Sequence, residues 1–224
     1  MMHDVSAVIF DMDGVIFDSE QVYYDAFFIV AKEHGLMATD AMVREFAGKS
    51  KSGCQLILQN LLDNDLEKTQ QFWQDWGRAR DALLHDNGMP FKSGFVELLQ
   101  SITATNRDVA IVTSAERADL EDNFRRTNTT LLDTFKHIVT IEAVKQPKPH
   151  PEPYDKAMRY LGYAPENCVV IEDSIPGVSA ALAANAQTIM INDYMQPEPS
   201  LRARLLHYAT HHQDILQFMQ TNGL

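Results

Sequence analysis

The chain has few of the residues that would place it in several large classes of protein. It holds only two cysteines, Cys54 and Cys168, and their separation fits neither a disulfide framework nor a metal site, so we expect reduced thiols. No apolar run approaches the roughly 20 residues that span a bilayer. Asp4 interrupts the start of the chain, and no long apolar segment of a signal peptide follows. The sequence therefore predicts a cytoplasmic protein that does not enter a membrane.

Basic residues are also scarce, with 19 lysines and arginines against 31 aspartates and glutamates and a formal net charge of -12. A surface with this balance repels the phosphate backbone, which argues against nucleic acid as a partner. A local basic site that binds a small phosphorylated molecule remains compatible with this net negative charge. We expect a small-molecule substrate and, for the assembly, a monomer or weak dimer.

Short apolar runs alternate with amphipathic segments along most of the chain. Strands are predicted at about 5–10, 109–112, 137–140, 169–171 and 188–191. Helices are predicted at about 19–34, 39–46, 52–62, 66–84, 94–103, 115–126, 154–161 and 176–185, with one or two more after residue 200. This order implies an α/β fold, a Rossmann-like, doubly wound parallel sheet with helices on both faces.

The segment from 19 to 87 shows no strand pattern and interrupts the alternation. We therefore expect residues 1–15 and 91–224 to form a Rossmann-like catalytic core, and residues 16–90 to form an inserted, all-helical cap domain. Connecting segments at 15–18 and 88–92 are the expected hinges between the two.

Three apolar runs end in side chains that can perform chemistry. Because ligands bind beyond the carboxyl ends of parallel strands, these side chains should meet at one edge of the sheet. Lys148 lies in the loop after the strand predicted at 137–140, which has the weakest apolar pattern of the five, and can reach the same place. Several carboxylates, a lysine and hydroxyl groups suit a hard cation that carries a phosphate, such as Mg²⁺. The residues concerned are Asp11, Asp13, Thr113, Ser114, Lys148, Glu172 and Asp173.

In this order the stretches Asp11-Met12-Asp13-Gly14-Val15, Thr113, Lys148-Pro149 and Glu172-Asp173-Ser174 resemble the four motifs of the haloacid dehalogenase-like hydrolase superfamily. The stretch Asp18-Ser19-Glu20 and the helical insertion resemble the branch that contains β-phosphoglucomutase and phosphoglycolate phosphatase. The resemblance covers nearly the whole chain. A single Asp-x-Asp would be weak evidence, whereas four motifs at strand ends are specific.

The resemblance implies a magnesium-dependent phosphomonoester phosphatase that acts on a small metabolite, such as a sugar phosphate, through an aspartyl-phosphate. Asp11 would be the nucleophile and Asp13 the general acid and base. Thr113 and Ser114 would bind phosphate oxygens, and Lys148 would neutralise negative charge. The implied ligands of the magnesium ion are an oxygen of Asp11, the main-chain carbonyl of Asp13 and Asp173, with Glu172 binding either directly or through water.

Two other functions remain open at this stage. A phosphosugar mutase is the first, although Tyr23 stands where the mutases of this branch carry a histidine. A non-catalytic phosphosugar-binding protein is the second. Asp13 argues against dehalogenation, since haloacid dehalogenases lack this aspartate. Phosphonate cleavage, for which the superfamily uses a cap lysine, would have to employ Lys49 or Lys51.

Substrate selection is expected to depend on the cap. Glu20 could bind sugar hydroxyls, while Lys51 and Arg78 (or Arg80) could meet an anionic leaving group. The alternative for each basic residue is a solvated helix face. The aromatic residues Phe72, Trp73 and Trp76 should form the core of the cap, with Trp76 as a further candidate to face the substrate.

Structural explanations compete with several of these assignments. Thr113 and Ser114 could cap the following helix, and Lys145 competes with Lys148 as the motif lysine, since Pro147 stands where a glycine commonly precedes it. The adjacent His211 and His212 are interpreted as an exposed pair rather than as a metal site. Gly177, with Ala180 and Ala181, indicates close helix packing.

Overall fold

The computed structural model describes residues 5–46, 51–192 and 196–223, which form two compact units. Unit 1 comprises Met1–Asp18 and Pro90–Leu224, and unit 2 comprises Ser19–Met89. The chain crosses between the units at 18/19 and at 89/90. Unit 2 is thus an insertion in the chain of unit 1, while its role as a cap remains a prediction.

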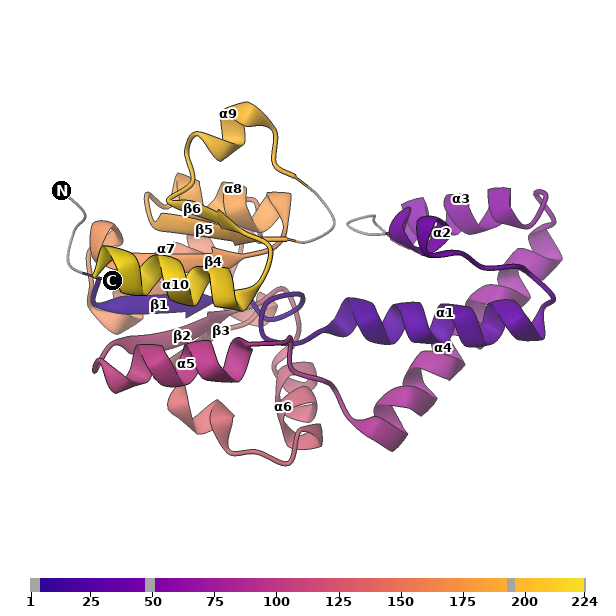
Figure 1. Ribbon diagram of the computed structural model, residues 1–224, viewed down its shortest axis with the longest axis horizontal. Coiled ribbons are helices and arrows are strands. Elements are labelled where there is room, and N and C mark those ends of the chain that lie inside the picture. The colour runs from indigo at the N-terminus through magenta and orange to yellow at the C-terminus, as the bar shows by residue number, and fades with distance from the viewer. Residues whose placement is uncertain (1–4, 47–50, 193–195, 224) are drawn as a thin grey trace. The chain divides into compact units, whose positions relative to one another are not determined.

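Unit 1 is built on a six-stranded sheet in which all strands are parallel (Figure 1). The strands are β1 (Ala7–Phe10), β2 (Asp108–Val112), β3 (His137–Val139), β4 (Cys168–Glu172), β5 (Gln187–Ile191) and β6 (His207–Ala209). Their order across the sheet is β3-β2-β1-β4-β5-β6. The two central strands are apolar at nearly every position because both of their faces are covered. The predicted α/β fold is confirmed.

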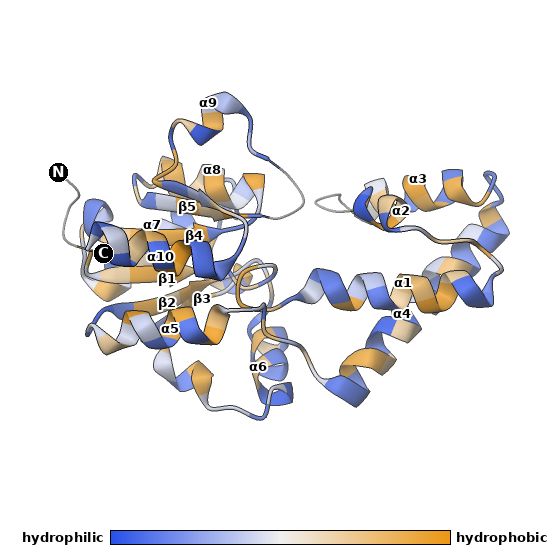
Figure 2. Cartoon of the chain, in the orientation of Figure 1, coloured by the Kyte–Doolittle hydropathy of each residue, from blue (hydrophilic) through white to orange (hydrophobic). Residues whose placement is uncertain are grey.

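The helices of unit 1 cover both faces of this sheet (Figure 1). They are α5 (Phe95–Ala104), α6 (Arg117–Arg126), α7 (Glu152–Leu161), α8 (Ile175–Ala183), α9 (Pro199–Arg202) and α10 (His212–Asn222), with short 3₁₀ turns at Leu131–Thr134, Ile141–Ala143 and Pro165–Asn167. Alternate strand residues such as Ile9 and Val170 face α7 and α8 in one core. Phe10 points to the other face, with its ring 5.7 Å from that of Phe95 on α5. The strands carry mostly hydrophobic residues, while the surrounding helices show hydrophilic bands (Figure 2).

The end of the chain differs from the sequence-based expectation of helices alone. Strand β6 lies between α9 and α10 and pairs with β5, with Ile191 opposite Ala209. Only Ala209 of its three residues is fully buried, so the strand lacks the apolar run that identified the others. An edge strand of this length leaves almost no sequence signal.

Unit 2 consists of α1 (Ser19–Glu33), α2 (Asp40–Arg44), α3 (Lys51–Leu61) and α4 (Leu66–Asn87). The N-caps of α2 and α4 are Thr39 and Asp65, whose side chains accept hydrogen bonds from backbone N–H groups of the first turn. The Phe27 ring lies at the centre of the core, within 5.2–5.3 Å of the Phe46, Phe72 and Trp76 rings. Trp73 packs against this cluster, which confirms the predicted aromatic core.

The two segments of unit 1 that lead to unit 2 lie side by side. The N–H of Asp18 donates to the carbonyl of Pro90 at 3.0 Å, and the N–H of Lys92 donates to that of Ile16 at 2.8 Å. The rings of Phe17 and Phe91 stack with a centroid distance of 5.4 Å. Both crossings therefore start from one short antiparallel pair.

Candidate active site

Strand register brings the predicted motif residues to one edge of the sheet. Phe10, the last residue of β1, is paired with Ile111 on β2 and with Ile171 on β4. Asp11 directly follows Phe10, and Glu172 directly follows Ile171. The N–H of Asp11 donates to the carbonyl of Ile171 at 3.0 Å. The side chains of Asp11 and Glu172 therefore emerge next to each other at the carboxyl ends of neighbouring strands.

The loop after β1 turns back tightly on itself. The carbonyl of Met12 accepts hydrogen bonds from Ile16 and Phe17, at 2.8 and 3.1 Å. Gly14 has φ +77°, and a Cβ atom there would lie 2.0 Å from Oδ2 of Asp173. Glycine is required for two reasons, since a side chain would strain the backbone and collide with the carboxylate. This absence of a side chain lets Asp173 approach the loop.

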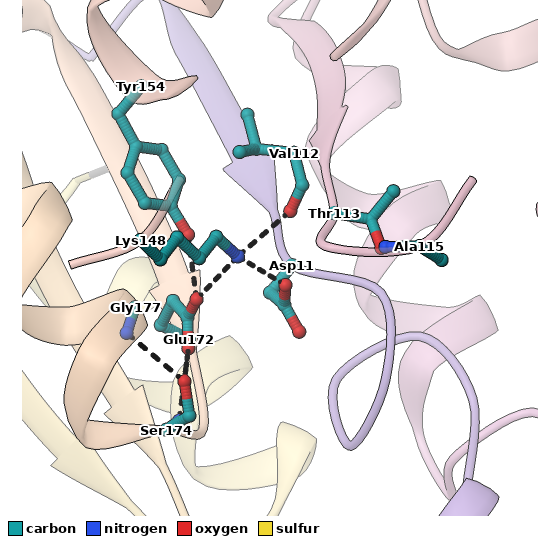
Figure 3. A network of polar contacts seen from close by, with 9 residues as sticks. All are labelled: Asp11, Val112, Thr113, Ala115, Lys148, Tyr154, Glu172, Ser174 and Gly177. Atoms are coloured by element: carbon teal, nitrogen blue, oxygen red, sulfur yellow. Dashed lines mark hydrogen bonds and ion pairs between the residues drawn. The ribbon is translucent and has the colours of Figure 1, made fainter. Parts of the chain in front are cut away.

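The ammonium group of Lys148 lies among three oxygen acceptors (Figure 3). Its Nζ is 2.5 Å from Oδ1 of Asp11, 2.7 Å from Oε1 of Glu172 and 3.1 Å from the carbonyl oxygen of Val112. Only 6% of the side chain is exposed. A lysine has three N–H donors, so all three are used, and the cation is fixed against Asp11. Lys145, in contrast, is exposed, and Lys148 is the lysine that reaches Asp11.

Glu172 is fully buried and each of its oxygens accepts two hydrogen bonds. Oε1 accepts from Lys148 at 2.7 Å and from the Tyr154 hydroxyl at 2.9 Å. Oε2 accepts from the N–H and the hydroxyl of Ser174, both at 3.0 Å. A Cβ at Gly177 would lie 1.6 Å from Oε1, so the predicted close packing of this glycine is against Glu172 itself.

Burial and charge together set the protonation of this cluster. Burial, with Glu172 and Asp13 nearby, raises the pKa of Asp11 to about 7, although Lys148 opposes the shift. Burial lowers the pKa of Lys148, but Asp11 and Glu172 outweigh it and hold that pKa well above its usual range. Burial also raises the pKa of Tyr154 well above its usual range, so its hydroxyl acts as a donor. The excess of acids over bases favours an added cation.

Three carboxylates are close enough to share such a cation. Oxygen atoms of Asp11, Glu172 and Asp173 all lie within 4.8 Å of one another. The side chain of Asp13 is not in this group and is exposed, although its charge acts on Asp11. Hard oxygen donors of this kind fit Mg²⁺ and leave room for water and substrate oxygens.

The hydroxyl groups after β2 adopt different environments. Thr113 is buried, and its hydroxyl accepts a hydrogen bond from the N–H of Ala115 at 3.0 Å. Helix α6 begins at Arg117 with Glu116 as its N-cap, which excludes the alternative that Thr113 or Ser114 is the N-cap of this helix. Ser114 is exposed. Thr113 instead shapes the turn that follows the strand.

The predicted substrate residues of the cap lie in unit 2. Glu20 is in the first turn of α1 and is half-buried. Arg78 is exposed and pairs with Asp75 on the same helix. Lys51 begins α3, but its side chain and the loop that holds Lys49 lie outside the described residues. Binding of substrate by these residues remains a prediction.

Tyr23 and Arg80 form a pair that the sequence did not indicate. Nη1 of Arg80 donates to the Tyr23 hydroxyl at 2.9 Å, and the guanidinium carbon lies 5.3 Å from the centre of the ring. The contact joins α1 and α4, elements far apart in sequence. Tyr23 therefore presents a phenol held by a cation where the resemblance implies a histidine in mutases.

The interpretation of His211 and His212 as an exposed pair is wrong for His212. Only 1% of His212 is exposed, while His211 is the exposed N-cap of α10. Nδ1 of His212 donates to the carbonyl of Ser93 at 3.1 Å, and its Nε2 has no hydrogen-bond partner among the described residues. Burial lowers the pKa of His212 to about 4. A helix period alone did not reveal this burial, because the partner segment is distant in sequence.

Sequence comparisons agree with the geometry of this edge. Residues 8–191 match the model of the family described as haloacid dehalogenase-like hydrolase. A phosphorylated carbohydrates phosphatase from Thermotoga maritima is 31% identical over 188 residues, which are 83% of this chain and 84% of the relative. Hexitol phosphatase A from Escherichia coli is 28% identical over 164 residues, which are 73% of this chain and 67% of the relative. The family and these relatives confirm the prediction of a hydrolase of the phosphatase class.

Structure comparison gives the same result. A HAD family hydrolase from Deinococcus radiodurans, solved with bound phosphate and sodium, has a TM-score of 0.77 against this chain and 27% sequence identity. The match covers 97% of this chain and 96% of that one. Among the described residues, no helix is long and apolar enough to cross a membrane. The sequence match, the parallel sheet and the acidic edge with its lysine together place this chain in the haloacid dehalogenase-like hydrolase family.

Proposed function

We propose that the chain is a magnesium-dependent phosphomonoester phosphatase that acts on a small metabolite, most simply a sugar phosphate. The observation that carries this proposal is the contact of Lys148 with Asp11 at the carboxyl edge of the sheet, beside Glu172 and Asp173. The names of the two curated relatives, which refer to phosphorylated carbohydrates and to hexitol, support the substrate class.

In the proposed reaction, a carboxylate oxygen of Asp11 attacks phosphorus, and the bond between phosphorus and the leaving oxygen breaks. Asp13 donates a proton to that oxygen, for which its exposed position beside Asp11 is suitable. Water then attacks the phosphorus of the aspartyl-phosphate and gives a proton to Asp13. The P–O bond to Asp11 breaks, which releases inorganic phosphate, restores the Asp11 carboxylate and leaves Asp13 protonated, as it was at the start.

The side chains around Asp11 would position and neutralise the phosphoryl group. Lys148 offsets the charge of nucleophile and phosphate, and Thr113 with the backbone at Ser114 receives phosphate oxygens. Asp11, Asp173 and the carbonyl of Asp13 would hold Mg²⁺, and Glu172, whose oxygens each accept two hydrogen bonds, would contribute through water. When bound, this ion would lower the repulsion between carboxylate and phosphate.

The test measures release of inorganic phosphate from a panel of sugar phosphates and p-nitrophenyl phosphate, with Mg²⁺ and with chelator. We expect turnover that requires the metal and falls by about 10³-fold or more in D11N, since the amide cannot act as nucleophile. The matched control is D133N, which neutralises an exposed aspartate on the 3₁₀ turn Leu131–Thr134. Full activity of D11N, or none in the wild type across the panel, would refute the mechanism.

A phosphosugar mutase remains the alternative within the family, and the same panel distinguishes it. A mutase would convert a hexose 1-phosphate to the 6-phosphate in a reaction that depends on a bisphosphate and releases little free phosphate. Tyr23, held by Arg80, offers no imidazole for proton transfer at the position where the resemblance implies one. We therefore expect inorganic phosphate as the main product.

A further inference from the structure

Tyr154 on α7 contacts both partners of the buried ion pair next to Asp11 (Figure 3). Its hydroxyl donates to Oε1 of Glu172 at 2.9 Å. The centre of its ring lies 5.2 Å from Nζ of Lys148, within the range of a cation–π contact. The side chain is fully buried, so these contacts are made away from solvent.

We propose that Tyr154 is a positioning residue, which fixes Oε1 of Glu172 and thereby places the Lys148 ammonium group against Asp11. This inference rests on the proposed function, in which Lys148 and Asp11 act on the phosphoryl group. Tyr154 is not proposed to contact the phosphoryl group. It acts on Asp11 through its contacts with Glu172 and Lys148.

The three acceptors of Lys148 explain why a residue behind Glu172 should matter. The carbonyl of Val112 is fixed at the end of β2, and Asp11 is the group that must react. Oε1 of Glu172 is the remaining acceptor, and it belongs to a flexible side chain whose placement is set by the hydrogen bonds that its carboxylate accepts. The position of the ammonium group therefore depends on what holds this oxygen.

The two oxygens of Glu172 are held differently. Oε2 accepts two hydrogen bonds from Ser174, whereas Oε1 accepts from Lys148 and Tyr154. Without the tyrosine hydroxyl, only the ammonium group would hold Oε1, and the two could shift together. Because phosphoryl transfer depends on placement, a displacement of about 1 Å can reduce the rate about 10²-fold.

Packing alone does not account for a tyrosine here. Its ring lies in the core with Ala157 and Met158, and phenylalanine would fill the same space. A hydroxyl in such a core is unfavourable unless it forms a hydrogen bond. This hydroxyl forms one, with the carboxylate that also holds the motif lysine.

The test compares Y154F with the matched control Y163F. Tyr163 also donates to a carboxylate, Oδ2 of Asp108 at 3.0 Å, but Asp108 is the first residue of β2, at the opposite end from Val112. Steady-state kinetics on one phosphomonoester at saturating Mg²⁺, a Mg²⁺ activation curve and thermal unfolding are measured for each variant. For Y154F we expect kcat to fall about 10- to 100-fold, as for other residues that orient a ligand or catalytic group, with KM within about threefold.

Y163F should keep kcat within about twofold of the wild type. A Y154F variant that is as active as the wild type, that unfolds below the assay temperature, or that loses no more activity than Y163F would overturn the positioning role. If the wild type is active and Y154F is unchanged, only this inference fails. If the wild type has no phosphatase activity, the proposed function fails and the inference fails with it.

Discussion

The surroundings of several individual side chains shift their pKa values. One example outside the acidic cluster is His212. The ring packs 6.1 Å from that of Phe95 and donates to Ser93, which follows the second crossing between the units. Burial is the main cause of its low pKa, which Lys92 lowers further and Glu97 partly raises again. The folded protein therefore keeps this ring neutral.

Neutral His212 makes stability depend on pH in a defined direction. The pKa is about 4 in the folded state against 6.5 for an ordinary histidine. Above pH 6.5 the stabilisation is complete, and as the pH falls toward 4 only the unfolded chain takes up the proton. The free energy of unfolding should fall by about 3 kcal/mol over this range from His212 alone. Urea unfolding at pH 7 and pH 5 measures the part of this loss, about 2 kcal/mol, that falls between these two values.

The variant H212N keeps a donor near the Nδ1 position but cannot be protonated. We expect it to lose about 2 kcal/mol less than the wild type between pH 6.5 and pH 5. The control H85N changes a histidine that is exposed on α4. Equal pH dependence in the wild type and H212N would show that the buried ring is not responsible.

Site residues could be identified from the sequence where they belong to a short motif, and not where they contact a residue that is distant in the chain. Asp11 and Glu172 belong to short motifs at the ends of strands and Lys148 to a Lys-Pro motif in a loop, and these were found without structure. Tyr154 was not found as part of the site, because it lies inside a predicted helix, 18 residues from its partner Glu172. The burial of its hydroxyl comes from the packing of α7, which no motif encodes.

At the scale of secondary structure, α8 is placed so that its first turns contact the end of β4. Ser174 is the N-cap of α8, and its hydroxyl accepts from the N–H of Gly177 while it donates to Glu172. The missing side chain at Gly177 allows the helix to approach the carboxylate. The cap of one helix is thus also part of the candidate site.

G177A should disturb the protein at this contact. The new methyl group would lie 1.6 Å from Oε1 and 1.9 Å from Cδ of Glu172, which four hydrogen bonds hold in place. We expect a loss of about 1–3 kcal/mol in the free energy of unfolding, together with lower phosphatase activity. Chemical denaturation and kinetics measure both.

The matched control is G77A in the interior of α4, where an added Cβ would meet nothing within 4 Å. Alanine favours the helix over glycine, so this variant should gain about 0.5–1 kcal/mol. A neutral or stabilising G177A would contradict the close approach of α8 to Glu172.

Secondary structure was predicted best where one element had a clear pattern of its own. The apolar runs of β1, β2, β4 and β5 and the glycine or cap signals of most helices gave their positions to within a few residues. Strand β6 was missed because it takes its conformation from pairing with β5 rather than from its own residues. Edge strands generally depend on such context.

At the scale of the whole molecule, the chain consists of two units with separate cores. The sequence indicated the insertion because an all-helical stretch interrupts an alternating pattern. It could not indicate that the two crossings pair with each other, since Asp18 and Pro90 are far apart in sequence and meet only in the folded chain.

This pairing predicts that unit 2 can be removed. In this variant, residues 19–89 are deleted and an Asn-Gly dipeptide links Asp18 to Pro90. The dipeptide should close a two-residue hairpin, because the segments on either side already pair in an antiparallel manner. We expect the variant to fold cooperatively and to hydrolyse p-nitrophenyl phosphate with Mg²⁺, but to discriminate poorly among sugar phosphates. Circular dichroism, thermal unfolding and the phosphate panel measure these properties.

The full-length protein is the control for the deletion. A variant that is unfolded at 25 °C would show that unit 1 needs unit 2 for stability. A folded variant with unchanged selectivity would instead contradict the proposed role of unit 2 in reading the leaving group.

The paired crossings also affect the order in which the protein folds. Strands β1 and β2 are neighbours in the sheet, yet roughly 100 residues separate them in the chain, and closing a loop of that length has a high entropic cost. If unit 2 folds first, its two ends come together, and the effective loop between these strands becomes much shorter. Contacts of long sequence separation slow folding, so the helical insertion should accelerate formation of the sheet that it interrupts.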